Sequence, residues 1–363
     1  MVTVPARGPR SLADHAAAMQ KRYGGEKISN GPPPAIVPSG SAALDWALRV
    51  GGYQRGRLYE MVGPKDSGKT TLGTEAMISF LAEFPGLGVA YVNLENTFDP
   101  KRACAMGLDC SREAIKSGRW NPMLAGSSEE ASDMARDQCS SGFISLVVID
   151  SVGAMESDRT QGKSAEKAAD AMGRNAKIIT QMCKALSKEA RDSQCTVLLI
   201  NQPRANYSGM GGDISAGPKL MEHATTARIQ MSAKGGETDV RKMRLPGEAD
   251  DLIVSLRCTA RVNRMKNGLP GRVAEMFVNR VGTEPYGPPG VDTADEYITL
   301  GVREKIITLG GAWYTLPDGT RFQGREKLAA AMRAEPALIK EIRSGIPFDD
   351  PIDDLDDQPE GST

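Results

Sequence analysis

The stretch GPKDSGKTT at residues 63–71 decides the fold. It matches G-x-x-x-x-G-K-[ST], the pattern of a phosphate-binding loop. The apolar run LYEMV at residues 58–62 precedes it, and a helical pattern over residues 72–81 follows it. A strand, a glycine-containing loop and a helix in this order form the context in which the motif holds phosphates. The sequence therefore predicts a nucleoside triphosphate site at this loop.

The chemistry of the loop depends on its backbone, its lysine and its first threonine. Glycine lets backbone N–H groups turn toward phosphate oxygens, and the N-terminus of the following helix adds positive charge. Lys69 is predicted to reach the β- and γ-phosphates, and the Thr70 hydroxyl is predicted to hold Mg²⁺. The predicted nucleotide-binding residues of the loop are Gly63, Pro64, Lys65, Asp66, Ser67, Gly68, Lys69, Thr70 and Thr71.

Polar residues at the ends of other apolar runs complete a predicted hydrolytic site. Asp150 follows the run LVVI at residues 146–149 and is predicted to lie near the metal, beside Thr70. Glu95 ends the run after the first helix, where a carboxylate can orient or deprotonate the attacking water. The amide of Gln202 is predicted to sense the γ-phosphate and to pass that state into residues 203–217. Glu95, Lys69 and Gln202 are thus the predicted catalytic residues.

Short apolar runs alternate with helical patterns along the middle of the chain. This alternation predicts an α/β fold with a central, mostly parallel sheet, whose ligand binds at the carboxyl ends of the strands. The expected strands are residues 58–62, 89–92, 144–149 and 197–200, and the expected long helices are residues 69–83 and 165–191.

Four zones are expected from the composition. Residues 1–35 contain an alanine-rich helical pattern at 11–23 and a proline-rich linker, which predicts either a docking arm or a frayed end. Residues 36–290 form the core, with a charged, exposed stretch at 233–251. Residues 291–346 are expected to form a small α+β domain, and residues 347–363 an acidic disordered tail that acts in interactions or only in solubility.

Charge, cysteines and histidines exclude several classes. The 363 residues carry a net charge of −1, so no overall basic bias indicates nucleic acid, although a neutral protein can contain a basic groove. The six cysteines are scattered and no secretory signal precedes them, which predicts reduced thiols and a cytoplasmic location. His15 and His223 are the two histidines, too few for a histidine zinc site. No apolar run reaches membrane-spanning length.

Seven further segments along the chain form a recognisable set of motifs: residues 39–45 (SGSAALD), 51–57 (GGYQRGR), 95–100 (ENTFDP), 150–152 (DSV), 200–204 (INQPR), 300–306 (LGVREKI) and 311–314 (GAWY). Together they resemble the RecA family of bacterial recombinases, phage-encoded members included, over nearly the whole chain. Helicases and clock ATPases share the core motifs of this family but lack its C-terminal ones, so the last two segments are the most specific.

The resemblance implies a RecA-like phosphate-loop ATPase core with an N-terminal helical arm and a small C-terminal domain. It implies ATP and Mg²⁺ as cofactors, and a helical filament on single-stranded DNA that pairs with homologous duplex and exchanges strands. It also implies DNA-stimulated ATP hydrolysis with Glu95 as the water-activating base, and places Asp99 near the adenine. A hexameric motor ATPase such as a DNA helicase is the alternative, and a filament protein without useful hydrolysis is a third reading.

Two glycine-bearing loops are implied to line the DNA channel, although each also fits a plain surface loop. They span residues 155–163 and 203–217. Tyr207 or Met210 is expected to supply the apolar wedge between bases for which the family uses a phenylalanine. The predicted DNA-binding residues are Arg159, Lys163, Arg204, Tyr207, Met210 and Lys219.

Three positions depart from the pattern of the family. Arg102 stands where a tyrosine usually stacks on adenine, and a guanidinium plane can also stack. The family reaches across the protomer interface with two lysines two residues apart, of which this chain keeps Lys266 and replaces the other by Gly268. Another interface lysine corresponds to Glu222. Activation of hydrolysis across the interface is therefore expected to be weaker or rewired.

Overall fold

The computed structural model describes residues 33–96, 98–154, 165–204, 214–215, 224–266 and 268–348, together with Ser11, Ala13, Ala17 and Lys21. For residues 165–175, 203–204 and 214–215 only the backbone is described. The predicted docking arm and the acidic tail lie almost wholly outside these ranges, apart from helical backbone at Ala13, Ala17 and Lys21.

The parallel part of the main sheet contains all the strands that the sequence predicts. Its five neighbouring pairs are all parallel. Their carboxyl ends therefore meet at one edge, where the phosphate loop also begins. In spatial order the strands are β10 (Ala227–Ala233), β3 (Leu58–Val62), β7 (Thr196–Asn201), β6 (Ile144–Asp150), β4 (Gly88–Asn93) and β5 (Trp120–Leu124).

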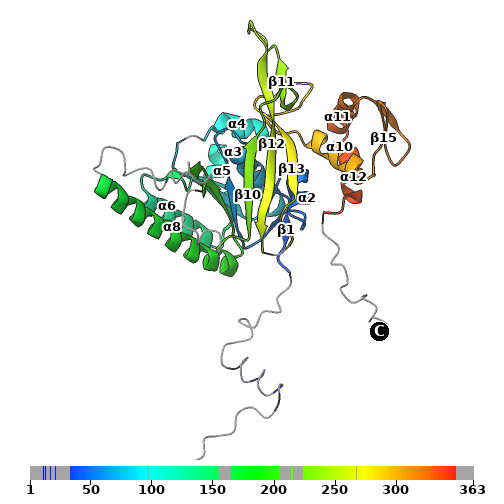
Figure 1. Cartoon of the computed structure of the whole chain (residues 1–363). Coiled ribbons are helices and arrows are strands. Elements are labelled where there is room, and N and C mark those ends of the chain that lie inside the picture. The colour runs from blue at the N-terminus through cyan, green and yellow to red at the C-terminus, as the bar shows by residue number, and fades with distance from the viewer. Residues whose placement is uncertain are drawn as a thin grey trace, which may run out of the picture. The chain divides into compact units, whose positions relative to one another are not determined.

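An antiparallel part continues the sheet beyond β10. The long strand β12 (Leu252–Met265) pairs with β10, with β13 (Val273–Asn279) and, at its beginning, with β11 (Val240–Met243), while β14 (Gly290–Val291) pairs with β13. The prediction of an α/β core with a mostly parallel sheet is confirmed, and the antiparallel strands extend it to ten strands among the described residues. Figure 1 shows β11 and the start of β12 projecting from the sheet as a hairpin, and the charged residues 233–251 are mostly exposed there.

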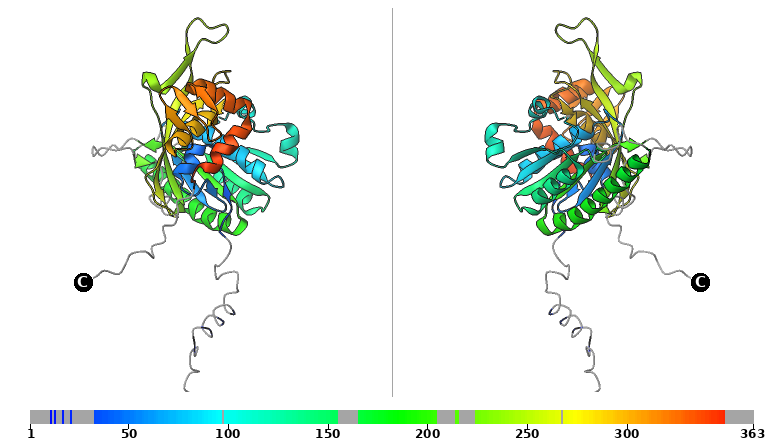
Figure 2. Two further views of the ribbon diagram at one scale, coloured as in Figure 1. Left: turned by 90° about the vertical axis from the view of Figure 1, so that its right-hand side faces the viewer. Right: turned by 90° about the vertical axis from the view of Figure 1, so that its left-hand side faces the viewer.

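Helices cover both faces of the sheet. On one face lies α3 (Lys69–Glu83), whose Leu72, Met77 and Phe80 belong to the same buried cluster as Tyr91 and Leu146. On the other face α6 (Ser128–Ser140) and α8 (Ala165–Ser193) pack against each other and against the sheet, as Figures 1 and 2 show. No helix among the described residues has the length and apolarity that a membrane crossing requires.

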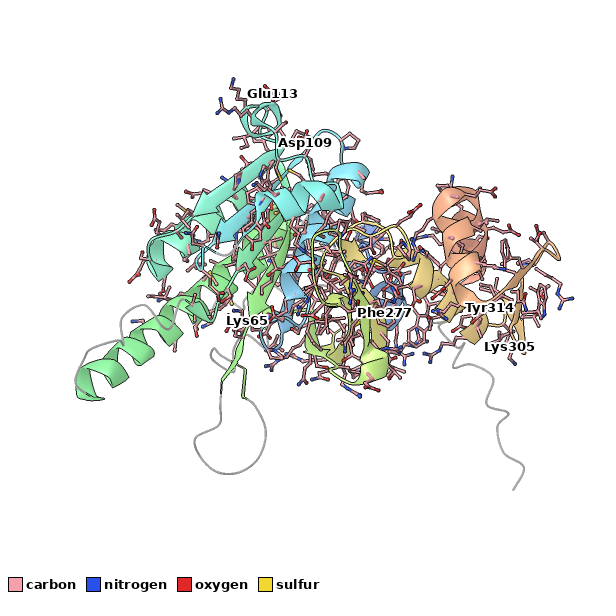
Figure 3. The ribbon with its side chains drawn as sticks, turned by 90° about the horizontal axis from the view of Figure 1, so that it is seen from above. Lys65, Asp109, Glu113, Phe277, Lys305 and Tyr314 are labelled. Carbon is pink, nitrogen blue, oxygen red and sulfur yellow. The ribbon has the colours of Figure 1, made fainter. Side chains whose placement is uncertain are left out.

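The last described part of the chain adds a small mixed module. The first helix of the module packs on β13 and on α2 (Ala42–Ala47). The module also has a three-stranded antiparallel sheet, which contains Tyr314 and lies away from Phe277 of the main sheet (Figure 3). The module consists of α10 (Thr293–Arg303), β15 (Thr308–Gly310), β16 (Trp313–Thr315), β17 (Arg321–Gln323), α11 (Arg325–Ala334) and α12 (Pro336–Gly345). The remaining elements are β1 (Ile36–Val37), β2 (Tyr53–Gln54), α4 (Pro100–Met106), α5 (Arg112–Lys116), β8 (Pro203–Arg204), β9 (Ile214–Ser215) and a 3-10 turn at Glu237–Asp239.

Two carboxylates at the start of α10 join this module to the hairpin. Arg241 of β11 donates to Asp292 at 2.6 Å and to Asp295 at 3.0 Å. From α11, Arg333 donates to Asp292 at 2.7 Å and Arg325 donates to Asp295 at 2.7 Å. Three guanidinium groups from two elements therefore share one pair of buried acids.

Candidate nucleotide site

The phosphate loop leaves β3 and enters α3 as the sequence predicts. Gly63 has no room for a side chain, because a Cβ atom there would lie 2.4 Å from the Met231 carbonyl oxygen. Gly68 caps α3 with φ of 88°, in the left-handed region that favours glycine. Both glycines are therefore required by the path of the backbone, and the loop opens toward the positive N-terminus of a 15-residue helix.

Lys69 is held inside the loop. Its Nζ donates to the carbonyl oxygens of Gly63 at 2.8 Å and Pro64 at 2.7 Å. Burial lowers the pKa of Lys69, an effect that the nearby carboxylates of Asp150 and Glu95 oppose. A bound phosphate would bring further negative charge to this ammonium group and so would favour its ionised form.

Thr70 and Asp150 meet where a metal is predicted. The Thr70 hydroxyl donates to Asp150 Oδ2 at 2.8 Å, and Tyr91 donates to the same oxygen at 2.6 Å. Burial raises the pKa of Asp150, although these two hydrogen bonds lower it. Hydroxyl and carboxylate oxygens suit Mg²⁺, which usually takes one or two carboxylates and fills its remaining positions with phosphates and water. The two residues therefore fit a magnesium ion bound together with a nucleotide.

Glu95 lies beside this pair, on the loop that follows β4. Its Oε1 accepts a hydrogen bond from Gln202 Nε2 at 2.6 Å and another from the Ser151 hydroxyl. The structure thus brings together the carboxylate predicted to activate water and the amide predicted to sense phosphate. Ser151 was not predicted, although it follows Asp150 directly in the sequence.

These groups line a single cavity of about 490 Å³. Its phosphate end contains the loop residues 65–71 together with Glu95, Asp150 and Gln202. Its far end contains residues of α4 and of the antiparallel strands. The far-end residues are Phe98, Asp99, Arg102, Ala103, Leu256, Cys258, Val278 and Arg280.

The far end is the place of the predicted base site. The Asp99 carboxylate accepts from the backbone N–H of Lys101 at 2.9 Å, so it caps α4 while it lines the cavity. Arg102 donates from Nη2 to the Asn279 carbonyl oxygen at 3.0 Å, which ties α4 to β13. Burial lowers the pKa of Arg102, and the nearby Glu75 carboxylate opposes this. The predicted stacking group is therefore anchored at the base end.

The remaining predicted residues lie elsewhere or outside the described residues. Lys266 directly follows β12, does not line the cavity, and donates to the Ala224 carbonyl oxygen at 3.4 Å. Only the backbone of Arg204 is described, in β8. The other predicted DNA-binding residues and one of the two interface departures fall outside the described ranges, and these are Arg159, Lys163, Tyr207, Met210, Lys219 and Glu222.

The parallel sheet, the loop after β3 and the paired Thr70 and Asp150 define a phosphate-loop nucleotide-binding protein. Comparisons with known proteins narrow this class. The family described as RecA N-terminal domain matches residues 17–278. Protein RecA of Salinispora arenicola is 30% identical over 357 residues, covering 95% of this chain and 93% of its own length.

Two further relatives agree. Protein RecA of Treponema denticola is 30% identical over 325 residues, with 86% of this chain and 72% of that protein covered, and Protein RecA of Acholeplasma laidlawii is 28% identical over 312 residues, with 85% and 86% covered. The chain belongs to the RecA family of DNA-dependent ATPases and recombinases. The match to the Salinispora arenicola protein covers 95% of the chain and so includes most of the C-terminal module as well as the core; the helicase alternative is not favoured.

Proposed function

We propose that this chain binds ATP with Mg²⁺, assembles as a helical filament on single-stranded DNA, and pairs that strand with homologous duplex. The observation that carries the proposal is the 2.6 Å hydrogen bond between Glu95 and Gln202 at the phosphate end of the cavity. A carboxylate that can act on water is thereby joined to an amide whose neighbours lead into the second predicted DNA loop. We also propose a cytoplasmic location.

The proposal assigns a role to each of five residues at the phosphate end of the cavity. Lys69 and the backbone of the loop hold the phosphates, and Glu95 orients and deprotonates the attacking water. Thr70 and Asp150 would hold Mg²⁺, which neutralises charge on the phosphates when bound. Gln202 exchanges its bond to Glu95 for one to the γ-phosphate, which links the state of the nucleotide to the DNA site.

ATP binding and filament formation on DNA are linked equilibria in this proposal. ATP favours the DNA-binding form only as far as it binds that form more tightly, and a nearly complete switch needs roughly 5.5 kcal/mol of differential binding. Base pairing supplies the sequence specificity, because exchanging one duplex for another is nearly isoenergetic and each mismatch loses stacking of about 1.4 kcal/mol. The protein then needs only backbone contacts to DNA, which depend strongly on salt.

The test combines hydrolysis with microscopy on the full chain. We expect phosphate release from ATP to rise on addition of single-stranded DNA, and a non-hydrolysable ATP analogue to produce helical filaments on that DNA. Hydrolysis that ignores DNA, or closed rings in place of filaments, would contradict the proposal. Filaments without DNA-stimulated hydrolysis would instead favour a DNA-coating role.

A further inference from the structure

Glu60 is a buried carboxylate that the hydrolytic site does not use. It lies in β3, the strand that leads into the phosphate loop, and is 1% exposed. Its strand runs between β10 and β7, with Glu60 opposite Arg228 on one side and Leu199 on the other. An ionisable side chain in the middle of a buried strand is costly unless it is paired, so its partners are informative.

The two oxygens of Glu60 face two different strands. Asn201 Nδ2, on β7, donates to Oε1 at 2.8 Å. Arg228 Nε, on β10, lies 3.4 Å from Oε2. Asn201 is fully buried and the Arg228 side chain is 16% exposed, so both contacts are shielded from water. We refer to Glu60, Asn201 and Arg228 together as the Glu60 clamp.

The two partners of Glu60 flank one segment of the chain. Asn201 stands immediately before Gln202, and Arg228 stands just after residues 205–223, the range that contains most of the second predicted DNA loop. The carboxylate thus joins the strand that enters this segment to the strand that leaves it. It does so from the strand that carries the phosphate loop.

A chain of hydrogen bonds connects the clamp to the hydrolytic site. Gln202 donates from its side chain to Glu95 at 2.6 Å, and its backbone N–H donates to Asn201 Oδ1 at 2.9 Å. The amide of Asn201 then donates to Glu60, so the Asn201 side chain accepts from Gln202 and donates to Glu60. Two hydrogen bonds therefore connect Gln202 to Glu60.

We propose that Glu60 is a positioning residue that couples the nucleotide site to the segment between β7 and β10 by holding both strands at fixed places relative to the phosphate loop. When Gln202 turns from Glu95 to the γ-phosphate, Asn201 moves with it, and Glu60 transmits that movement to Arg228. This inference rests on the proposed DNA-dependent hydrolysis. It adds the residue that carries the signal across the sheet.

Glu60→Gln is the sharpest variant for a test. An amide keeps the size of the side chain and can still accept from Asn201, but its NH₂ group cannot accept from Arg228. Arg228→Met breaks the same contact from the other side and keeps an unbranched side chain. Glu189→Gln is the matched control, because it removes a carboxylate from an ion pair with Arg136 at 3.0 Å between α8 and α6.

The first measurement is the ratio of single-stranded DNA affinities with a non-hydrolysable ATP analogue and with ADP. We expect Glu60→Gln and Arg228→Met each to reduce this ratio at least tenfold, which is about 1.4 kcal/mol of coupling. The double variant should reduce the affinity ratio no more than either single variant does, because the two single variants and the double variant all break the same contact. KM for ATP without DNA should stay within about twofold of the wild-type value. A purely structural role would lower the melting temperature and leave the ratio intact.

The second measurement needs no DNA and separates this inference from the proposed function. Hydrogen exchange over residues 203–226 should slow when the ATP analogue binds wild-type protein and Glu189→Gln, and should not respond in Glu60→Gln. If wild-type protein shows no nucleotide-dependent DNA binding, the proposed function fails while the exchange experiment still decides the role of Glu60. An equal exchange response in Glu60→Gln and wild-type protein overturns the coupling role.

Discussion

The two ends of the nucleotide cavity are built in different ways. The phosphate end consists of one contiguous loop and of side chains at the ends of parallel strands, which are linked in pairs by hydrogen bonds. The base end is assembled from α4 (Pro100–Met106) and from β12 and β13, which begin only at Leu252, far along the chain. The phosphate end is therefore determined mainly by local sequence, and the base end by long-range strand pairing.

This difference sets how each end tolerates change. At the phosphate end, backbone geometry and a few polar atoms must coincide, so one substitution removes a chemical function. At the base end, binding depends on stacking and shape, to which several side chains contribute modestly. We therefore expect substitutions at the phosphate end to abolish turnover and those at the base end to change affinity and selectivity.

Replacement of Glu95 by glutamine should have the largest effect. An amide cannot take a proton from water, so we expect DNA-stimulated hydrolysis to fall by about 10²–10⁴-fold while ATP still binds. Single-turnover phosphate release and nucleotide binding measure the two effects separately. Asn96→Ala, on the neighbouring exposed residue, is the control. Retained hydrolysis in Glu95→Gln would assign the base to another residue.

Lys69→Ala should have the second-largest effect, a loss of about 10²–10³-fold in kcat. The ammonium group is the cation that we propose for phosphate binding, and it donates to the Gly63 and Pro64 carbonyl oxygens. Steady-state hydrolysis at saturating ATP provides the measurement. Lys101→Ala removes an exposed lysine and should leave kcat unchanged. A similar loss in both variants would indicate a general defect.

At the base end, Arg102→Ala should raise KM for ATP by about tenfold or less and leave kcat almost unchanged. Loss of a stacked guanidinium removes about 0.5–2 kcal/mol of binding. Arg102→Tyr should restore the affinity, since an aromatic ring can also stack on a base. Comparison of KM for ATP and GTP in the three proteins shows how far Arg102 sets selectivity. A drop in kcat alone would place Arg102 in the hydrolytic machinery instead.

The smallest expected effect concerns Glu75, which supports the base end from α3. Burial raises its pKa from 4.5 to about 7, while its bond with the Val291 N–H acts in the opposite direction. The folded state then binds the proton more tightly than the unfolded state, so the stability from this group falls as pH rises from about 4.5 to about 7 and is constant above that.

Glu75→Gln should therefore reduce the difference in melting temperature between pH 5 and pH 8 by about 2–5 °C. Differential scanning calorimetry at both pH values gives the measurement. Glu113→Gln on α5, an exposed carboxylate seen at the edge of Figure 3, is the control and should leave the pH dependence as it is. An unaltered pH dependence in Glu75→Gln would show that another group titrates.

The same contrast explains what could be predicted from the sequence. The strand at residues 58–62 and the helix at 69–83 have the bounds that the sequence predicts, because an apolar run, a glycine loop and a helical period are local signals. Glu95, Asp150 and Gln202 could be found for the same reason, since each lies at or just after the end of a buried strand. Their roles remain proposals.

The sequence around the residues of the base end contains no comparable local pattern. Val278 and Arg280 reach the cavity only because β13 pairs with β12, and nothing near them in sequence marks a ligand. Tyr91 was missed because an inward tyrosine in a buried strand resembles an ordinary core residue, although its hydroxyl binds Asp150. The antiparallel half of the sheet depends on pairings between distant strands, which periodicity alone does not determine.

The shared anchor of the hairpin and the C-terminal module has a mechanical consequence. Arg241, Arg325 and Arg333 hold the same two acids, so a force that pulls on the hairpin is carried into α11 as well as into the sheet. If the contact between Arg241 and Asp292 broke, the contact between Arg241 and Asp295 would carry the force. The hairpin would therefore separate from the module only when both contacts are broken. The structure thus joins the projecting hairpin to the C-terminal module through one shared pair of acids.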